Sequence, residues 1–140
     1  MGQNWYLYKK EQLPGKIMIK VLLVDDDEII RETLTEVLKL RNFYVHSLSD
    51  GTKVVSEINE NNYDIIILDI VMPNKEGLET IQDVRKVNAK IPILAVSGGG
   101  RTTPSSNLEL AKMMGANDTL IKPFDSQSLI QKMQNLLNIG

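Results

Sequence analysis

The sequence predicts a doubly wound α/β domain, in which a five-stranded parallel sheet is covered by helices on both faces. Short runs rich in Val and Ile alternate five times with segments of helical periodicity along the chain. These runs are almost continuously apolar, which is typical of parallel strands buried on both faces. Regular alternation of strands and helices favours right-handed crossover connections and hence a doubly wound sheet.

The apolar runs are the five predicted strands. In order, they are Ile19–Val24, Phe43–Leu48, Ile65–Leu68, Ile91–Val96 and Thr119–Ile121. All of them are far shorter than the roughly 18 consecutive apolar residues that a membrane-spanning helix requires. We therefore expect a domain that does not associate with a membrane.

Helical periodicity predicts one helix after each strand. Apolar stripes predict four of the five helices. The first has Ile30, Leu34, Val37 and Leu38, the second Val54, Val55 and Ile58, the third Leu78, Ile81 and Val84, and the fifth Leu129, Ile130, Met133, Leu136 and Leu137. The third helix is expected to open from a turn at residues 73–77. The fourth is predicted from its boundaries, which are Pro104, a capping box of Ser106 and Glu109, and a stop at Gly115. Asp125 is the predicted N-cap of the fifth helix.

The composition excludes several classes of protein. With 140 residues, of which 42% are hydrophobic and 24% charged, the chain can bury one core without disulfides and is too apolar for a disordered protein. It contains no Cys, which excludes a disulfide framework, a thiolate zinc site and a cysteine nucleophile. The lack of Cys also fits a reducing cytoplasm, where we expect the protein to be located. Because His46 is the one His, a histidine-rich metal site is excluded as well.

Two segments are predicted along the chain. Residues 1–17 contain three of the seven aromatic residues, and we interpret them as an N-terminal extension: a tail, a short docking strand or a cloning artefact. Residues 18–140 form the predicted domain. They contain 13 basic and 17 acidic residues, a net charge of −4 with His neutral. A surface of that sign is a poor match for a phosphate backbone, so we expect no direct binding to nucleic acid.

Polar side chains follow four of the five predicted strands. Asp25 and Asp26 follow the first strand, Asp69 the third, Ser97 the fourth and Lys122 the fifth. In a doubly wound sheet the carboxyl ends of the strands lie on one edge, and ligands bind there. Each residue taken singly is more often an ordinary strand end or a solvated helix cap than a functional group. Their combination predicts one site at this edge.

Three carboxylates that share a site require a cation, because like charges repel one another. Oxygen ligands indicate a hard ion, and a few carboxylates with waters and a phosphoryl oxygen are the usual ligands of Mg²⁺. With the charge balanced, one carboxylate can act as a nucleophile toward phosphorus. Asp69 is the predicted nucleophile, because it stands alone at the end of a buried strand. Ser97 can donate a hydrogen bond to a phosphoryl oxygen, and Lys122 can balance its charge.

Four segments resemble a known family. They are VLLVDDDEIIRETL, IIILDIVMPNKEGLE, ILAVSG and TLIKPF. Together they resemble the marker segments of the receiver domain of bacterial two-component response regulators, over about residues 19–137. The resemblance to the chemotaxis regulators of this family implies a flavodoxin-like fold with five helices and the strand order 2-1-3-4-5.

The resemblance also implies roles for individual residues. Asp69 resembles the phosphoacceptor of the family. Asp25 and Asp26 resemble the acidic pair that holds Mg²⁺ together with Asp69, and the backbone carbonyl of Val71 would be a further metal ligand.

On the other side of the site, Ser97 resembles the switch hydroxyl of the family and Lys122 resembles the lysine that contacts the phosphoryl group. Pro123 resembles a proline that follows a cis peptide bond, which would set the direction of Lys122.

The resemblance thus implies a signalling domain, not an enzyme that acts on an external substrate. Asp69 is expected to accept a phosphoryl group from the phosphohistidine of a sensor histidine kinase or histidine phosphotransfer protein. The domain is expected to assist its own phosphorylation and dephosphorylation. The added charge, about −2 at neutral pH, is expected to switch a surface formed by helix 4, strand 5 and helix 5, which binds a downstream protein.

Two other functions are consistent with such a fold. The first is a receiver-like docking module that is not phosphorylated, although loss of Asp69, the acidic pair or Lys122 would be the mark of such a module, and all four residues are present. The second is a Mg²⁺-dependent phosphohydrolase that uses its Asp on an external phosphoester, which requires a roomy pocket or a cap.

Overall fold

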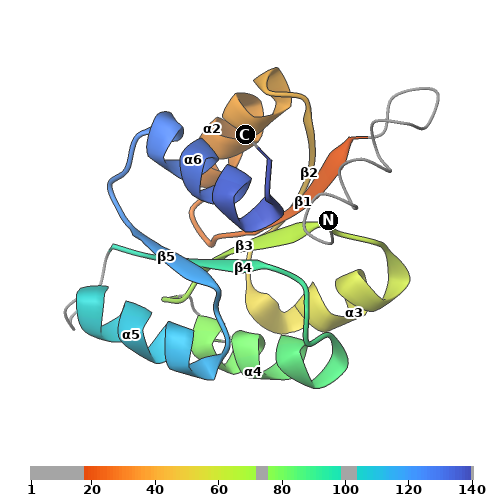
Figure 1. Ribbon diagram of the computed structural model, residues 1–140, viewed down its shortest axis with the longest axis vertical. Coiled ribbons are helices and arrows are strands. Elements are labelled where there is room, and N and C mark those ends of the chain that lie inside the picture. The colour runs from red at the N-terminus through yellow and green to blue at the C-terminus, as the bar shows by residue number, and fades with distance from the viewer. Residues whose placement is uncertain (1–17, 72–75, 99–103, 140) are drawn as a thin grey trace.

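The predicted fold class is confirmed by the computed structural model, which describes residues 18–71, 76–98 and 104–139, the first three residues of the last segment by their backbone only. Five parallel strands form one sheet in the order β2-β1-β3-β4-β5 (Figure 1). The strands are β1 (Ile19–Val24), β2 (Phe43–Leu48), β3 (Ile65–Asp69), β4 (Ile93–Ser97) and β5 (Asp118–Ile121). The predicted N-terminal extension lies outside the described residues.

The helices cover both faces of the sheet. They are α2 (Glu28–Leu40), α3 (Val54–Glu60), α4 (Gly77–Val87), α5 (Pro104–Met114) and α6 (Ser126–Leu137), and a short 3₁₀ helix, η1 (Gly51–Lys53), precedes α3. Figure 1 shows α2 and α6 on one face and α3, α4 and α5 on the other. The turn predicted at residues 73–77 lies mostly outside the described residues, but α4 begins at its last residue.

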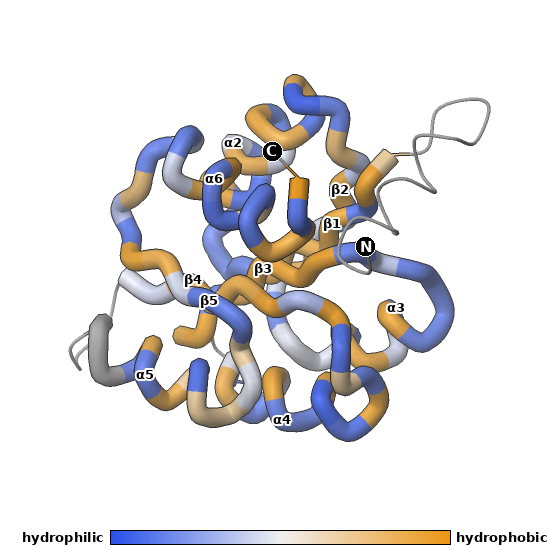
Figure 2. Tube along the Cα trace, in the orientation of Figure 1, coloured by the Kyte–Doolittle hydropathy of each residue, from blue (hydrophilic) through white to orange (hydrophobic). Residues whose placement is uncertain are grey.

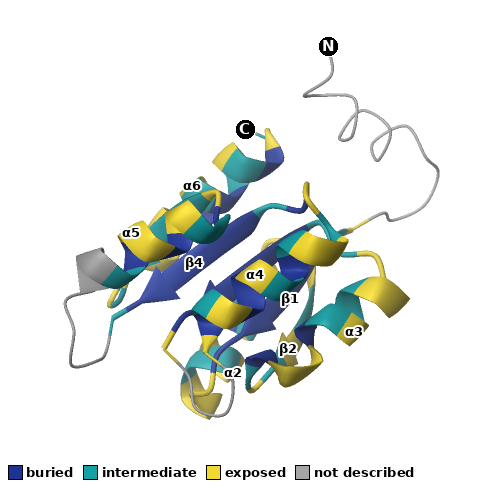
Figure 3. Ribbon diagram, turned by 90° about the horizontal axis from the view of Figure 1, so that it is seen from below, coloured by how far each residue is buried: buried dark blue, intermediate teal, exposed yellow. Residues whose placement is uncertain are grey.

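The core consists of two apolar layers, one on each face of the sheet. Successive residues of a strand point to opposite faces, so Val21 and Leu23 of β1 pack under α2 and α6, whereas Leu22 and Val24 pack under α3 and α4. All five residues of β3 are buried. Figure 2 shows apolar strands in the interior and helices that carry polar residues on the outside. Figure 3 shows the strands as a buried layer between helices that are partly exposed.

The predicted fourth strand begins too early. The structure starts β4 at Ile93, two residues after the predicted start at Ile91. Pro92 has no N–H to donate to a neighbouring strand, although its carbonyl still accepts a hydrogen bond from the Ile66 N–H at 2.9 Å. Ile91 remains in the core at 6% exposure, which explains why the apolar run extends beyond the strand.

One helix cap is confirmed and another is wrong. The Asp125 side chain accepts a hydrogen bond from the Ser128 N–H at 2.7 Å and caps α6 as predicted. The capping box of Ser106 and Glu109 is not the start of α5, because the helix already begins at Pro104. Proline is favoured at the first helical position, where no N–H is required. No helix in the described segments is long and apolar enough to cross a membrane.

Candidate phosphoryl and metal site

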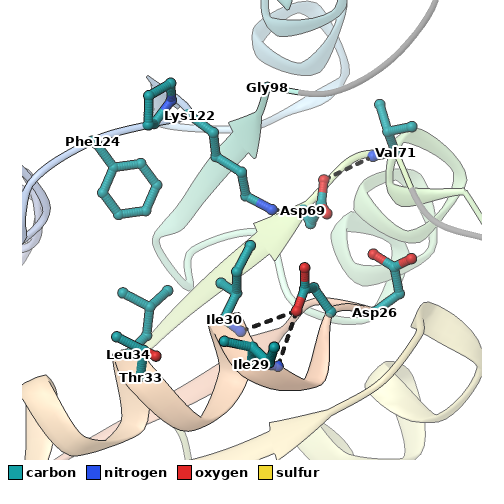
Figure 4. A pocket seen from close by; sticks show the side chains of 12 residues that line it. Asp26, Ile29, Ile30, Thr33, Leu34, Asp69, Val71, Gly98, Lys122 and Phe124 are labelled. Atoms are coloured by element: carbon teal, nitrogen blue, oxygen red, sulfur yellow. Dashed lines mark hydrogen bonds and ion pairs between the residues drawn. The ribbon is translucent and has the colours of Figure 1, made fainter.

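The structure brings the predicted acidic residues together at the carboxyl edge of the sheet. Asp25 and Asp26 follow β1, and Asp69 is the last residue of β3, which pairs with β1. Each of the three residues offers one carboxylate oxygen within 4.8 Å of the others. Figure 4 shows Asp26 facing Asp69 from the loop after β1.

Hydrogen bonds fix the position of Asp25. Its N–H donates to the Leu48 carbonyl at the end of β2 at 3.1 Å, and its own carbonyl accepts from Arg31 Nη1 at 2.7 Å. Its Oδ1 accepts from the Asp27 N–H at 2.9 Å. Asp27 in turn caps α2, accepting from Ile29 N–H at 2.9 Å and from Ile30 N–H at 3.2 Å. Asp25 is therefore held rigidly and is 3% exposed, whereas the neighbouring Asp26 is exposed.

Asp69 is held from the other side. Its Oδ1 accepts a hydrogen bond from the Val71 N–H at 3.0 Å. The first residue of α4, Gly77, packs against the turn that follows β3 and donates from its N–H to the Ile70 carbonyl at 3.2 Å. A methyl group at position 77 would lie 2.7 Å from the Asp69 carbonyl oxygen, so this close approach requires glycine.

Lys122 completes the cluster from the end of β5. Its Nζ lies 2.7 Å from Asp25 Oδ2 and 3.2 Å from Asp69 Oδ2. Figure 4 shows the side chain extending toward Asp69. Its backbone N–H donates to the Ser97 carbonyl at 2.9 Å, and the Lys122–Pro123 peptide bond is cis, as predicted. One ammonium group therefore bridges two buried carboxylates.

The charges of this cluster perturb its pKa values. Burial raises the pKa of Asp69, and the Val71 N–H and the Lys122 ammonium offset this only in part. Burial lowers the pKa of Lys122, but its contacts with Asp25 and Asp69 outweigh burial, and the net pKa is raised. Lys122 is therefore positively charged at neutral pH. A single ammonium does not neutralise three carboxylates, so the cluster retains an excess of negative charge.

Ser97 lies next to the acidic cluster but is buried behind the surface of the cavity. It ends β4, one residue beyond Val96, which pairs with Asp69. The side chain is fully buried, and its Oγ has no hydrogen-bond partner among the residues that the structure describes. Ser97 does not line the cavity at the acidic cluster, whereas Gly98 does. A buried hydroxyl without a partner is costly, which makes it a ready donor for a new acceptor.

A cavity of about 630 Å³ opens beside the cluster and extends over an apolar surface that the sequence analysis did not identify. Its apolar part is formed by residues of α2 and of the segment after β5, which are Ile29, Ile30, Leu34, Pro123 and Phe124. Ile29 is 74% exposed. Ile29 lies outside the apolar stripe that predicts α2. An apolar residue on the polar side of this helix could therefore have indicated the exposed apolar surface from the sequence.

The donor set fits a hard divalent cation. The three side-chain ligands that the described residues offer are carboxylate oxygens, and a cation would relieve their mutual repulsion. Val71 is 40% exposed and lines the cavity, which is compatible with its predicted role. Its backbone carbonyl as a ligand stays a prediction.

The fold and this cluster define a doubly wound domain with a candidate phosphoryl and metal site at the carboxyl edge of its sheet. The chain belongs to the family of response regulator receiver domains, which matches residues 21–134. Members of this family are phosphoacceptor domains of two-component signalling systems and bind Mg²⁺ through acidic residues. The predicted family and its strand order are thus confirmed.

Among curated relatives, the transcriptional regulatory protein CpxR homolog of Haemophilus influenzae is 34% identical over 120 residues, which are 86% of this chain and 51% of the relative. Response regulator MprA of Mycobacterium sp. (strain KMS) is 33% identical over 119 residues, 85% of this chain and 50% of the relative. The chain spans about half the length of these relatives. Because one of them is named a transcriptional regulatory protein, the comparisons do not support the expectation that nucleic acid is not a partner.

Solved structures agree with the fold. A putative response regulator from Chloroflexus aurantiacus superposes with a TM-score of 0.80 at 30% identity, covering 87% of this chain and 99% of that one. The chemotaxis protein CheY4 of Vibrio cholerae gives a TM-score of 0.77 at 30% identity, covering 86% and 99%.

Proposed function

We propose that Asp69 accepts a phosphoryl group from a phosphohistidine on a sensor histidine kinase or a histidine phosphotransfer protein. The observation that supports this most strongly is the position of Asp69: buried, at the edge of a cavity, and 3.2 Å from a lysine ammonium. In the transfer, the bond between phosphorus and the imidazole nitrogen breaks while a bond from phosphorus to a carboxylate oxygen of Asp69 forms. The histidine is the leaving group, so the domain is an acceptor and not an enzyme for an external substrate.

The residues that would hold Mg²⁺ are Asp25, Asp26 and Asp69, with the backbone carbonyl of Val71. When bound, the metal supplies positive charge that offsets the charge of the phosphoryl oxygens. Lys122 supplies a second positive charge. Its ammonium is held between two carboxylates, and so it can contact a phosphoryl oxygen on Asp69 without a large rearrangement.

Ser97 connects the phosphoryl group to a binding surface. Its hydroxyl, which has no partner among the described residues, can donate to a phosphoryl oxygen once turned toward the cavity and draw the end of β4 toward Asp69. The proposed binding surface consists of α5, β5 and α6. These elements correspond to helix 4, strand 5 and helix 5 of the sequence prediction. Leu110, Met113 and Ile121 on this surface are 41%, 82% and 49% exposed, which supports a protein partner there.

The apolar part of the cavity is the proposed contact for the phosphodonor protein, because a donor must cover it to reach Asp69. Replacing the exposed Ile29 by Glu is expected to slow transfer from a phosphorylated histidine phosphotransfer domain about tenfold, since it places a charge in an apolar contact. Labelling by phosphoramidate, a small phosphodonor, should not change. Leu40→Glu is the matched control, because Leu40 is 81% exposed at the opposite end of α2. Equal slowing by both variants would contradict this contact.

The metal site is tested by Asp25→Asn and Asp26→Asn. Each variant removes one negative ligand and is expected to weaken Mg²⁺ binding about tenfold or more, because ligand charge largely sets the affinity of such sites. Isothermal titration calorimetry with Mg²⁺ measures this, and labelling by phosphoramidate should fall in parallel. Retention of wild-type Mg²⁺ affinity in both variants would place the metal elsewhere.

Two assays separate this function from the alternatives. A receiver-like docking module that is not phosphorylated would not bind beryllofluoride with Mg²⁺, whereas an acceptor aspartate binds it. A phosphohydrolase would turn over added phosphoesters, whereas an acceptor domain releases at most the phosphoryl group bound to itself. A cytoplasmic location stays a prediction.

A further inference from the structure

We propose that Gly98 is a positioning residue for Lys122. Because position 98 carries no side chain, the backbone of Lys122 can approach β4 closely enough for its ammonium group to reach the two buried carboxylates. The proposal rests on the proposed function for its effect on phosphoryl transfer, but its effect on metal binding is independent of that function.

The contact between the two residues is very close. A methyl group at position 98 would overlap Lys122 Cβ and would lie 2.9 Å from both Cα and the carbonyl oxygen of Lys122. Carbon atoms in favourable contact are about 3.5–4.0 Å apart. Two of the three atoms belong to the backbone, so no rotamer change of Lys122 relieves the overlap. Figure 4 shows Gly98 at the end of its strand, beside Lys122.

The backbone of Lys122 is hydrogen-bonded to β4 at this point, so it can move only by straining the sheet pairing. The Lys122 N–H donates to the carbonyl of Ser97, the residue before Gly98, at 2.9 Å. This bond continues the pairing of β4 with β5, in which Ser97 is opposite Ile121. Added volume at position 98 is therefore expected to push the backbone of Lys122 away from the cluster.

Displacement of Lys122 has two opposite consequences. Its ammonium and a divalent cation neutralise the same carboxylates, because Nζ lies 2.7 Å from Asp25 and 3.2 Å from Asp69. Loss of the ammonium therefore strengthens metal binding. It also removes the positive charge available to the transferred phosphoryl group, and so it slows transfer. General distortion of the site would instead weaken metal binding and slow phosphoryl transfer together.

The test measures both properties in the whole chain. Mg²⁺ affinity is measured by NMR on the amides of Asp27 and Val71, which donate to Asp25 and Asp69, and the rate of labelling is measured with phosphoramidate. For Gly98→Ala we expect about tenfold tighter Mg²⁺ binding and about tenfold slower labelling. Lys122→Ala should give the same pair of changes, and Gly98→Ala should add little to either in the Lys122→Ala background.

Two other close glycines are controls. Gly77→Ala places a methyl group 2.7 Å from the Asp69 carbonyl and is expected to weaken Mg²⁺ binding and slow labelling together, because it moves a ligand. Gly115→Ala, at a φ of +128° after α5, is expected to lower the melting temperature without changing either property. Should Gly98→Ala fail to fold, Lys122→Gly in the same chain removes the Cβ that makes the shortest of the three contacts and is expected to restore folding in part.

The proposal is overturned if Gly98→Ala leaves both properties unchanged, if it weakens both, or if Lys122→Gly does not restore a misfolded Gly98→Ala chain. If the variants change Mg²⁺ affinity as expected but the wild-type protein takes no label, the proposed function is contradicted and the positioning role of Gly98 stands.

Discussion

Asp69→Asn is expected to reduce phosphoryl labelling by phosphoramidate to background. The amide of Asn is not a nucleophile toward phosphorus, while its size matches that of Asp, so the variant should fold. Intact-mass spectrometry after incubation with Mg²⁺ and phosphoramidate measures the label. Asp64→Asn is the matched control, because Asp64 precedes the same strand at its opposite end and accepts from the Lys20 N–H at 2.7 Å. A stable label on Asp69→Asn would contradict the assignment.

The same variant has a second, pH-dependent readout in the metal-free protein. Because burial raises the pKa of Asp69 above its unfolded value, the ionised carboxylate opposes folding at neutral pH. The penalty is absent below the unfolded pKa, where the carboxyl is protonated in both states. Asp69→Asn is therefore expected to raise the melting temperature at pH 7, and the gain should disappear as the pH falls below about 4. A lower melting temperature at pH 7 would contradict this.

Arg85→Ala is expected to destabilise the domain by about 3 kcal/mol, a large part of the roughly 5–15 kcal/mol typical of a domain. The Arg85 guanidinium makes five hydrogen bonds of 2.8–3.2 Å across two loops. Its acceptors are the carbonyl oxygens of Asn88, Ile91 and Gly115, with Gly115 accepting twice, and Asn117 Oδ1. Truncation leaves the partly buried carbonyl oxygens without this donor, and the ends of α4 and α5 lose their link.

Urea unfolding measures this loss. Lys86→Ala is the control on the same helix, because the Lys86 side chain is 78% exposed and its Nζ lies 3.9 Å from Asp83; exposed pairs contribute little. We expect it to stay within about 0.5 kcal/mol of wild type. A similarly small effect of Arg85→Ala would show that solvent replaces the guanidinium.

Much of the fold and of the acidic cluster could be predicted, because both follow from local patterns and one topological rule. Apolar runs mark the strands, and parallel strands end on one edge, so residues as distant as Asp25 and Lys122 were expected to meet. Their Nζ–Oδ2 distance of 2.7 Å confirms this. The sequence offered both Pro104 and the Ser106–Glu109 capping box for the start of α5, and the structure confirms Pro104 and not the box. Both are favourable helix starts, and the pattern does not decide between them.

Other features depend on tertiary contacts that no local pattern encodes. The Arg85 side chain bonds to the carbonyl of Gly115, 30 residues further along the chain. The burial of Ser97 Oγ depends on its surroundings at the end of β4, and the need for glycine at position 98 depends on how closely β5 approaches. Each of these becomes visible only when the separate strand ends are placed side by side.

The decisive measurement is the position of the phosphoryl group. After labelling with phosphoramidate and Mg²⁺, borohydride reduction converts an aspartyl phosphate to homoserine, which peptide mass spectrometry locates. We expect homoserine at position 69 in wild-type protein incubated with Mg²⁺, and none when Mg²⁺ is chelated. Homoserine at position 25 or 26, or a phosphoryl group on Ser97 with Asp69 unmodified, would contradict the proposed acceptor.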